Sequence, residues 1–307
     1  MKEGRKCMST NTMFLGDFEE ADNLFADNDV VREYKEHFVA FLDILGFKHT
    51  IQNYQCNDIY KILKEITSEM RGPKPRWSGI VIEAYEHIHY RILSDSIILF
   101  VEATIEDSFP ALIDVCTDLQ IRLASLDEPV LLRGGISKGG LYYEMDMIYG
   151  IGLTKAYYLE SNLAKYPRIV LLGETWNAGL NTVKYIYNIK MNYVGIDKEE
   201  DELYFIDFLR AKCQSVIKQK EYYDRLISKC KQYIDSSVDA SLREKYIWLN
   251  NRIKRSISKD DLLQEAYNKE KGEDGMRGFM EWMDLIREKK NMIANKEFMV
   301  VQEIDNE

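Results

Sequence analysis

The strongest apolar run in the chain covers residues 38–47 and contains one carboxylate, Asp43, and one glycine, Gly46. A run of this length that ends at a turn residue predicts a buried strand over residues 38–45. An ionised carboxylate in a buried strand is costly unless a cation compensates it. Asp43 therefore indicates a metal ion or another cation at the end of this strand.

Residues 88–100 repeat this pattern, with Asp95 between two serines that interrupt the apolar run. The pattern predicts a β-hairpin with strands over about residues 80–91 and 95–101 and with Asp95 at its bend. Neighbouring strands lie about 4.8 Å apart, so Asp43 and Asp95 could meet at one end of a sheet. Such a pair repels itself unless it shares divalent cations, which phosphoryl transfer uses. The residues alone favour a metal-dependent nucleotide enzyme.

The remaining apolar spacing alternates between helical and strand-like segments. Helices are expected at 57–66, behind Asn57 as a candidate N-cap, at 108–123 and at 152–164, and strands at 129–143, 168–172 and 202–208. This order predicts an α+β fold in which helices cover one face of a mainly antiparallel sheet.

Composition divides the chain into three parts. We expect an acidic N-terminal arm at residues 1–35, a catalytic α+β domain at 36–210 and a helical C-terminal extension at 211–307. Within the extension, helices are expected at 213–233, 241–257 and 279–293, with a linker at 269–275. We expect the extension to support packing or assembly rather than chemistry.

The 307 residues include 51 acidic and 41 basic side chains, which gives a net charge of −10. This charge argues against duplex nucleic acid as a partner, while a local basic pocket for a nucleotide remains compatible with it. Neither a signal peptide nor the run of about 20 apolar residues that spans a bilayer is recognisable, so we expect a cytoplasmic protein without membrane contact. The five cysteines form no Cys-x-x-Cys pair and are expected to be reduced thiols with a packing role.

Two further groups of residues have a functional and a structural interpretation. His87 and His89 alternate on a predicted strand, which suggests zinc, but without a third nearby ligand a structural role is favoured. Several tyrosines could form a base-stacking shelf or a dimer interface, and the interface is favoured. These are Tyr142, Tyr143, Tyr149, Tyr157 and Tyr158.

Four motifs follow one another at residues 41–47, 91–95, 132–139 and 150–161. In order and spacing they resemble the catalytic domain of class III nucleotide cyclases, over about residues 36–210. The resemblance implies that Asp43 and Asp95, helped by the backbone carbonyl of Ile44, hold two Mg²⁺ or Mn²⁺ ions. It also implies that the 3′-hydroxyl of a nucleoside triphosphate attacks its own α-phosphorus and expels pyrophosphate.

The glycine turn after Asp43 is expected to bind the phosphates through backbone N–H groups of Leu45, Gly46 and Phe47. Base recognition departs from the purine cyclases of the class, because their lysine and acidic residue correspond here to Arg91 and Met147. An arginine fork suits carbonyl acceptors, whereas methionine accepts little from an exocyclic amine. Adenine recognition is therefore expected to be lost, although Asp146 lies next to Met147.

The transition-state asparagine and arginine of the class lie four residues apart on one helix face and correspond here to Thr154 and Tyr158. Both can still donate a hydrogen bond. The arginine's positive charge is missing, so Lys138, Lys155, Lys165 or the metal ions are expected to offset the charge on the phosphorus.

This altered set resembles the pyrimidine nucleotide cyclases of the bacterial Pycsar antiphage system. Those enzymes make cyclic UMP or cyclic CMP, which activates a separate effector. The resemblance implies UTP or CTP as the substrate, with the choice between them open. It also implies a homodimer in which the metal-binding aspartates of one subunit face the base and transition-state residues of the other.

Two alternatives remain. The first is a catalytically inactive cyclase-like dimer that binds nucleotide or a partner protein for signalling, which the missing arginine supports and the retained aspartates oppose. The second is a diguanylate cyclase or polymerase-like palm, which shares paired acids on a sheet. The acidic Gly-Gly-x-x-Phe type of signature is absent, and Arg133-Gly-Gly-Ile is only superficially similar, so this alternative ranks last.

Overall fold

The computed structural model describes residues 31–71, 83–184, 194–196, 201–210, 216–236, 239–260 and 264. The chain divides into two units, Met1–Tyr34 and Lys35–Glu307. Every helix and strand named below lies in the second unit.

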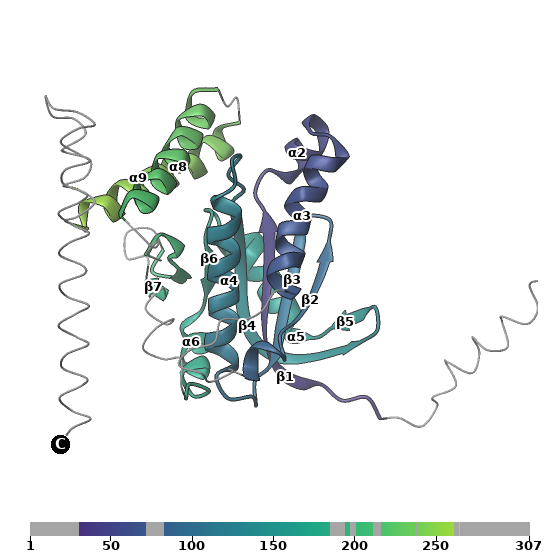
Figure 1. Ribbon diagram of the computed structural model, residues 1–307. Helices are drawn as coiled ribbons and strands as arrows, with labels where there is room; N and C mark the ends of the chain where they lie inside the picture. The colour runs from purple at the N-terminus through teal and green to yellow at the C-terminus, as the bar shows by residue number, and fades with distance from the viewer. Residues whose placement is uncertain are drawn as a thin grey trace, which may run out of the picture. The chain divides into compact units, whose positions relative to one another are not determined.

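The strands form one sheet in the order β2-β3-β1-β4-β6-β8-β7, with β5 paired to β4 (Figure 1). Their bounds are β1 (Lys35–Ile44), β2 (His89–Leu93), β3 (Ser96–Glu102), β4 (Leu132–Glu144), β5 (Met147–Tyr149), β6 (Ile169–Leu171), β7 (Val194–Ile196) and β8 (Tyr204–Ile206). Only the pair β4 and β6 is parallel among these strands. The mixed α+β class with a mainly antiparallel sheet is therefore confirmed.

The helices are α2 (Phe47–Asn53), α3 (Cys56–Arg71), α4 (Ser108–Ala124), α5 (Ile151–Tyr158), α6 (Gly173–Leu180), α8 (Val216–Ser236) and α9 (Ala240–Ser258). A π-helical turn, Leu159–Leu163, continues α5, and short 3-10 turns occur at Glu83–Tyr85 and Phe208–Arg210. Within the described residues, no helix is both long and apolar enough to cross a membrane.

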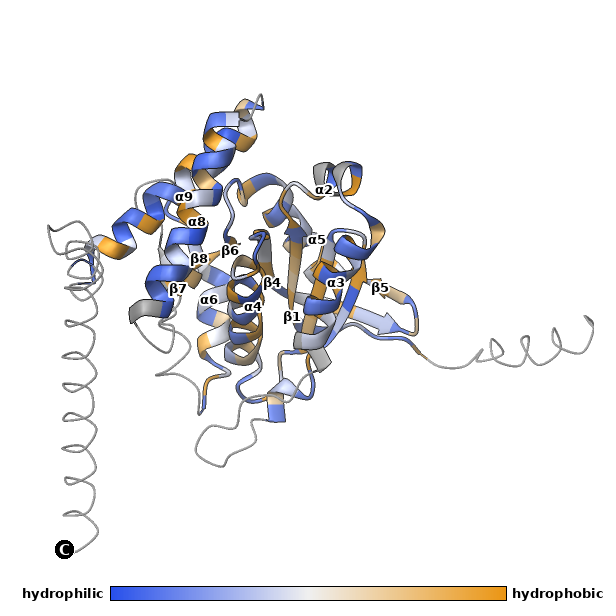
Figure 2. Ribbon diagram, turned by 45° about the horizontal axis from the view of Figure 1, so that its top comes forward, coloured by the Kyte–Doolittle hydropathy of each residue, from blue (hydrophilic) through white to orange (hydrophobic). Residues whose placement is uncertain are grey.

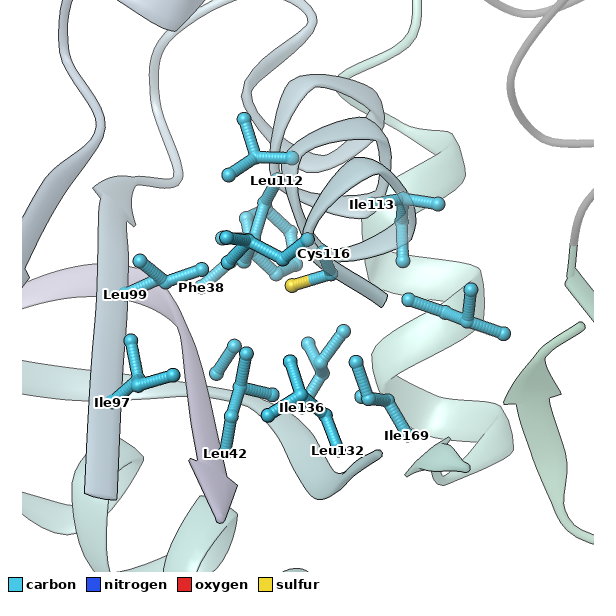
Figure 3. Close-up of a cluster of buried hydrophobic side chains, with 14 of the residues drawn as sticks. Phe38, Leu42, Ile97, Leu99, Leu112, Ile113, Cys116, Leu132, Ile136 and Ile169 are labelled. Atoms are coloured by element: carbon cyan, nitrogen blue, oxygen red, sulfur yellow. The ribbon is translucent and has the colours of Figure 1, made fainter. Parts of the chain in front are cut away.

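Alternate residues of the central strand β1 face opposite sides of the sheet. Phe38 and Leu42 lie in the main hydrophobic cluster with Leu112 of α4 (Figure 3). Val39 points the other way and packs in a second cluster with Ala156 of α5. Helices thus cover both faces of the sheet, which corrects the expectation that they cover one face.

The C-terminal helices α8 and α9 are amphipathic (Figure 2) and share a hydrophobic cluster with the sheet domain that includes Leu131. The ring of Trp248 in α9 stacks on Tyr166 with centroids 5.0 Å apart. Arg252 of the same helix donates a 2.6 Å hydrogen bond to the buried carboxylate of Asp207. These contacts fix α9 against the sheet where β6 begins and β8 ends.

Most expected elements are present, with differences at three places. Residues 83–88 form a 3-10 turn and a bend rather than a strand, and the buried Tyr85 there donates a 2.5 Å hydrogen bond to Asp114. Asn57 lies inside α3 rather than at its N-cap, and the sequence pattern did not predict α2, α6, β5 or β7. The expected arm up to residue 30, the linker and the last helix lie outside the described residues, and the three-part division stays a prediction.

The contact between β4 and α5 gives a stability test at Gly135. A Cβ atom at Gly135 would lie 2.5 Å from the Ala156 carbonyl oxygen and 2.9 Å from the Glu160 nitrogen. Gly135→Ala should therefore lower the free energy of unfolding by about 3 kcal/mol. Gly173→Ala is the matched control, because its Cβ would only touch Tyr204 at 3.6 Å. Urea denaturation of both variants measures the difference, and equal stabilities would contradict the described packing.

Candidate active site

The two aspartates that the sequence singled out lie at one end of the sheet, Asp43 on a strand and Asp95 in the turn before the neighbouring strand. Asp43 in β1 is paired with Ser96 in β3, directly after Asp95 in the β2–β3 turn. The N–H of Ile44 donates to the backbone carbonyl of Asp95 at 3.1 Å. Ser94 makes this tight turn possible with a φ of 59°. The hairpin expected around Asp95 is present, and the structure brings both residues together with Ile44.

The Asp43 carboxylate is largely removed from water, with 19% of its side chain exposed. Burial raises its pKa from 3.8 to about 6, and the charges of Glu160 and Asp95 act in the same direction. A hydrogen bond and the positive charge of Arg133 act against this rise. Additional positive charge beside Asp43 would therefore be stabilising.

Arg133 and Glu160 complete this charge cluster, and sequence analysis assigned neither a role. Arg133, opposite Asp43 in the β1–β4 register, donates from Nε to Asp43 Oδ2 at 3.0 Å. Its Nη2 lies 2.7 Å from Oε1 of Glu160, whose side chain is only 5% exposed. The hydroxyl of Ser161 donates to the other oxygen of Glu160 at 2.8 Å. The available sequence signal was a charged residue at the start of an apolar strand and a glutamate directly after the apolar Leu159.

The donor set suits a hard divalent cation. Two carboxylates and a backbone carbonyl, from Asp43, Asp95 and Ile44, are oxygen ligands of the kind that Mg²⁺ and Mn²⁺ take. The described residues contain no group of three or more His, Cys, Asp or Glu side chains suited to a metal. A metal ion here would therefore also need oxygens from substrate or water, as Mg²⁺ commonly does in phosphate sites.

The expected phosphate-binding backbone follows Asp43 directly. Gly46 has a φ of 77°, a left-handed conformation that favours glycine. The N–H of Leu45, however, donates to the carbonyl of Leu131 at 2.9 Å, so it can bind phosphate only if this bond opens. The side chain of Phe47 is buried in the hydrophobic core.

The expected base-recognition residues lie together at the hairpin that connects β4 and β5. Arg91 in β2 donates from Nη2 to the carbonyl of Met145 at 2.7 Å and from Nη1 to the carbonyl of Tyr90 at 2.9 Å. Met147 begins β5, and 54% of it is exposed. Within the described chain, no hydrogen bond or ion pair connects Arg91 to either aspartate.

Thr154 and Tyr158 lie on the exposed side of α5. They are one helical turn apart, and the Thr154 hydroxyl donates to the Gly150 carbonyl at 3.2 Å. The helix buries its other side, including Ala156, against the sheet. No hydrogen bond among the described residues joins either residue to Asp43 or Asp95.

The three lysines expected to compensate for the missing arginine have other partners. Lys138 lies 3.7 Å from Glu36, Lys155 lies 3.7 Å from Glu174, and Lys165 lies 2.8 Å from Glu244. Each ion pair is at least partly exposed, and none includes a carboxylate of the Asp43 cluster.

Some of the histidines and tyrosines considered above are packed in the structure and others are exposed. His87 lies outside the strand and 3.6 Å from Glu83, while His89 packs its ring 5.4 Å from that of Phe100. Tyr143 packs against the same Phe100 ring at 4.8 Å, so it belongs to a packed aromatic cluster. By contrast, Tyr149, Tyr157 and Tyr158 are exposed at 44%, 53% and 56%.

A cavity of about 610 Å³ lies behind the expected phosphate-binding backbone. Ile44, Leu45 and Gly46 form one wall, and Tyr54, residues 126–131 between α4 and β4, and side chains of α3, α8 and α9 form the others. Four carboxylates and two lysines line it, and each lysine is paired with one of these carboxylates. This charge balance does not suit a triphosphate, so the nucleotide is not placed in the cavity.

Similarity to known proteins is found among solved structures. No protein-family model and no curated protein matches the sequence. Similar solved structures include the guanylyl cyclase domain of the RhoGC fusion protein from the fungus Blastocladiella emersonii (16% identity, TM-score 0.42, covering 57% of this chain and 95% of that chain). Others are the guanylate cyclase domain of RhGC from Catenaria anguillulae in complex with GTP (15%, 0.40, 57% and 98%) and a bacterial light-regulated adenylyl cyclase (13%, 0.34, 62% and 98%). At these identities and TM-scores, we infer no activity and no residue role from them.

The raised pKa of Asp43 gives a pH test on the metal-free protein. Because the folded-state pKa of about 6 exceeds the ordinary 3.8, the folded protein holds this proton more tightly. Asp43 thus contributes stability below about pH 4 that is lost as the pH rises to about 6. The melting temperature of Asp43→Asn, relative to wild type, should therefore rise over this range and then level off.

Thermal unfolding in the presence of a chelator measures this difference. Asp235→Asn, at an exposed position of α8, is the matched control for replacing an aspartate by asparagine. A melting difference for Asp43→Asn that is the same at every pH would show that the Asp43 carboxyl titrates normally.

Proposed function

We propose that this chain is a nucleotide cyclase that converts UTP or CTP into the 3′,5′-cyclic nucleotide and pyrophosphate. The observation that carries the proposal is the pair Asp43 and Asp95, held at one end of the sheet by β1 and by the β2–β3 turn beside it. A paired, partly buried set of oxygen donors is what metal-assisted phosphoryl chemistry needs. The ordered sequence motifs that resemble class III cyclases give the reaction type.

In the proposed reaction, the 3′-oxygen forms a bond with the α-phosphorus while the bond from this phosphorus to the β-phosphate oxygen breaks. The hydroxyl proton passes to water, and pyrophosphate leaves. Asp43, Asp95 and the Ile44 carbonyl would hold Mg²⁺ or Mn²⁺, which supplies positive charge to the phosphates. Arg133 orients Asp43 and favours its ionised form, and Glu160 fixes Arg133.

The proposed active unit is a homodimer. Exposed apolar side chains on the β2–β3 turn, the β4–β5 hairpin and α5 support an interface on this face; they are Leu93, Met145, Met147, Ile151, Tyr157 and Tyr158. Contiguous apolar exposure is typical of association surfaces. A partner subunit there could present its own Thr154 and Tyr158 to the aspartates, to which neither residue is hydrogen-bonded within the described part of one subunit.

Base choice and biological role are inferred from the altered motifs. Arg91, anchored by the Met145 carbonyl, retains further donors of its fork for a pyrimidine carbonyl. Met147 beside it offers little to an adenine amino group. We infer a cytoplasmic role in bacterial antiphage defence, in which cyclic UMP or cyclic CMP activates a separate effector.

Product analysis tests this proposal. The purified chain, incubated with ATP, GTP, CTP and UTP in turn and with Mn²⁺ or Mg²⁺, should form cyclic UMP or cyclic CMP, detected by mass spectrometry. Asp43→Ala and Asp95→Ala should each lower the rate at least about 100-fold, because each removes a ligand for the phosphate-bound metal. Asp235→Ala should retain the wild-type rate.

Absence of a cyclic product from all four triphosphates would refute the cyclase proposal. Tight nucleotide binding without turnover would instead favour the inactive signalling dimer, which the replacement of the transition-state arginine by Tyr158 makes the second candidate.

A further inference from the structure

One lysine of the C-terminal helices lies near the Asp43 cluster without a partner of its own. Lys245 in α9 is half-buried, and no hydrogen bond or ion pair among the described residues involves it. Its neighbour Glu244 points elsewhere, toward Lys165 at 2.8 Å and Tyr166 at 3.4 Å. A half-buried lysine whose ammonium group forms no ion pair is the kind of group that an anionic ligand would stabilise.

Packing on either side of Lys245 places it beside the candidate active site. Leu242 and Tyr246 line the same cavity as the backbone that follows Asp43. Tyr246 also lies in the cluster that contains Leu131 and against which Leu45 packs. Leu45 is two residues from Asp43, and Leu131 is two residues from Arg133. The residues around all three charged groups therefore pack together.

The electrostatic surroundings of Lys245 agree with this placement. Burial lowers its pKa, and the positive charge of Arg133 lowers it further. The carboxylates of Asp239, Asp43 and Glu244 act in the opposite direction. Lys245 thus interacts with both members of the Arg133–Asp43 pair.

We propose that Lys245 is a phosphate-binding residue whose ammonium group contacts the polyphosphate end of the nucleotide substrate and the pyrophosphate product. This inference rests on the proposed function, and it gives the C-terminal helices a part in the site. A lysine is a compact charge on a flexible stem and can follow a phosphate as it moves. It also supplies positive charge that the paired lysines 138, 155 and 165 do not bring to the site.

The simpler explanation is that Lys245 packs its methylene stem along α9 and leaves its charge in water. The two explanations differ in what happens when the charge alone is removed. Lys245→Met keeps a flexible stem and removes the ammonium group, whereas Lys245→Arg keeps the charge. Lys254, exposed on the same helix without a partner among the described residues, gives the matched control Lys254→Met.

Calorimetry of inorganic tripolyphosphate binding to the full chain, with Mn²⁺ present, distinguishes the two explanations. This measurement does not depend on turnover. Lys245→Met should bind at least about tenfold more weakly than wild type, the size of one charge-assisted hydrogen bond. Lys245→Arg should stay within about threefold of wild type, and Lys254→Met should bind like wild type. Circular dichroism checks that each variant is folded, and Lys245→Gln repeats the test if the methionine variant is unstable.

Wild-type affinity in Lys245→Met, equal losses in Lys245→Met and Lys254→Met, or no tripolyphosphate binding by wild type would each overturn the phosphate role. Failure of the cyclase proposal can be distinguished from failure of the Lys245 proposal. If no triphosphate yields a cyclic product while tripolyphosphate binding still depends on Lys245, the reaction is wrong and the phosphate site stands. If cyclic product forms and Lys245→Met leaves both its KM and tripolyphosphate binding unchanged, the reaction stands and the Lys245 role is wrong.

Discussion

The site depends on keeping one carboxylate, Asp43, partly buried at the end of a central strand. Burial makes its charge costly, and the neighbouring negative charges of Asp95 and Glu160 add to that cost. The protein offsets part of it with a single guanidinium, Arg133, bonded to Asp43 and paired with Glu160. One arginine paired with two carboxylates, with the charge of Asp95 also acting on Asp43, leaves an excess of negative charge that a divalent cation would neutralise.

The fold brings the charged residues of this cluster together from distant parts of the chain. β1 and the β2–β3 turn bring the aspartates together, β4 brings Arg133, and the turn after α5 brings Glu160. Gly135 lets α5 approach β4 closely enough for this. The helix α9 closes the same end of the sheet through Trp248 and Arg252. A change in the packing of α5 or α9 would therefore alter the charge around Asp43.

The sequence pattern predicted the fold class and the meeting of Asp43 and Asp95, because apolar periodicity and turn residues are local signals. It did not reveal the contacts of Arg133, since that with Asp43 depends on the register of β1 with β4 and that with Glu160 on the π-helical turn after α5. It expected Lys138, Lys155 and Lys165 to supply charge, but their partners are set by tertiary packing. It gave the C-terminal helices a role in packing or assembly only, because nothing local in α9 distinguishes Lys245 from the exposed Lys254.

The central claim is that Asp43 and Asp95 form a metal site for a nucleotide. Anomalous X-ray diffraction at the manganese edge, from crystals grown with Mn²⁺ and a triphosphate that cannot cyclise, tests it most directly. The account predicts manganese peaks within coordination distance of carboxylate oxygens of both aspartates and of the triphosphate. Manganese bound to the triphosphate but to neither aspartate would contradict it.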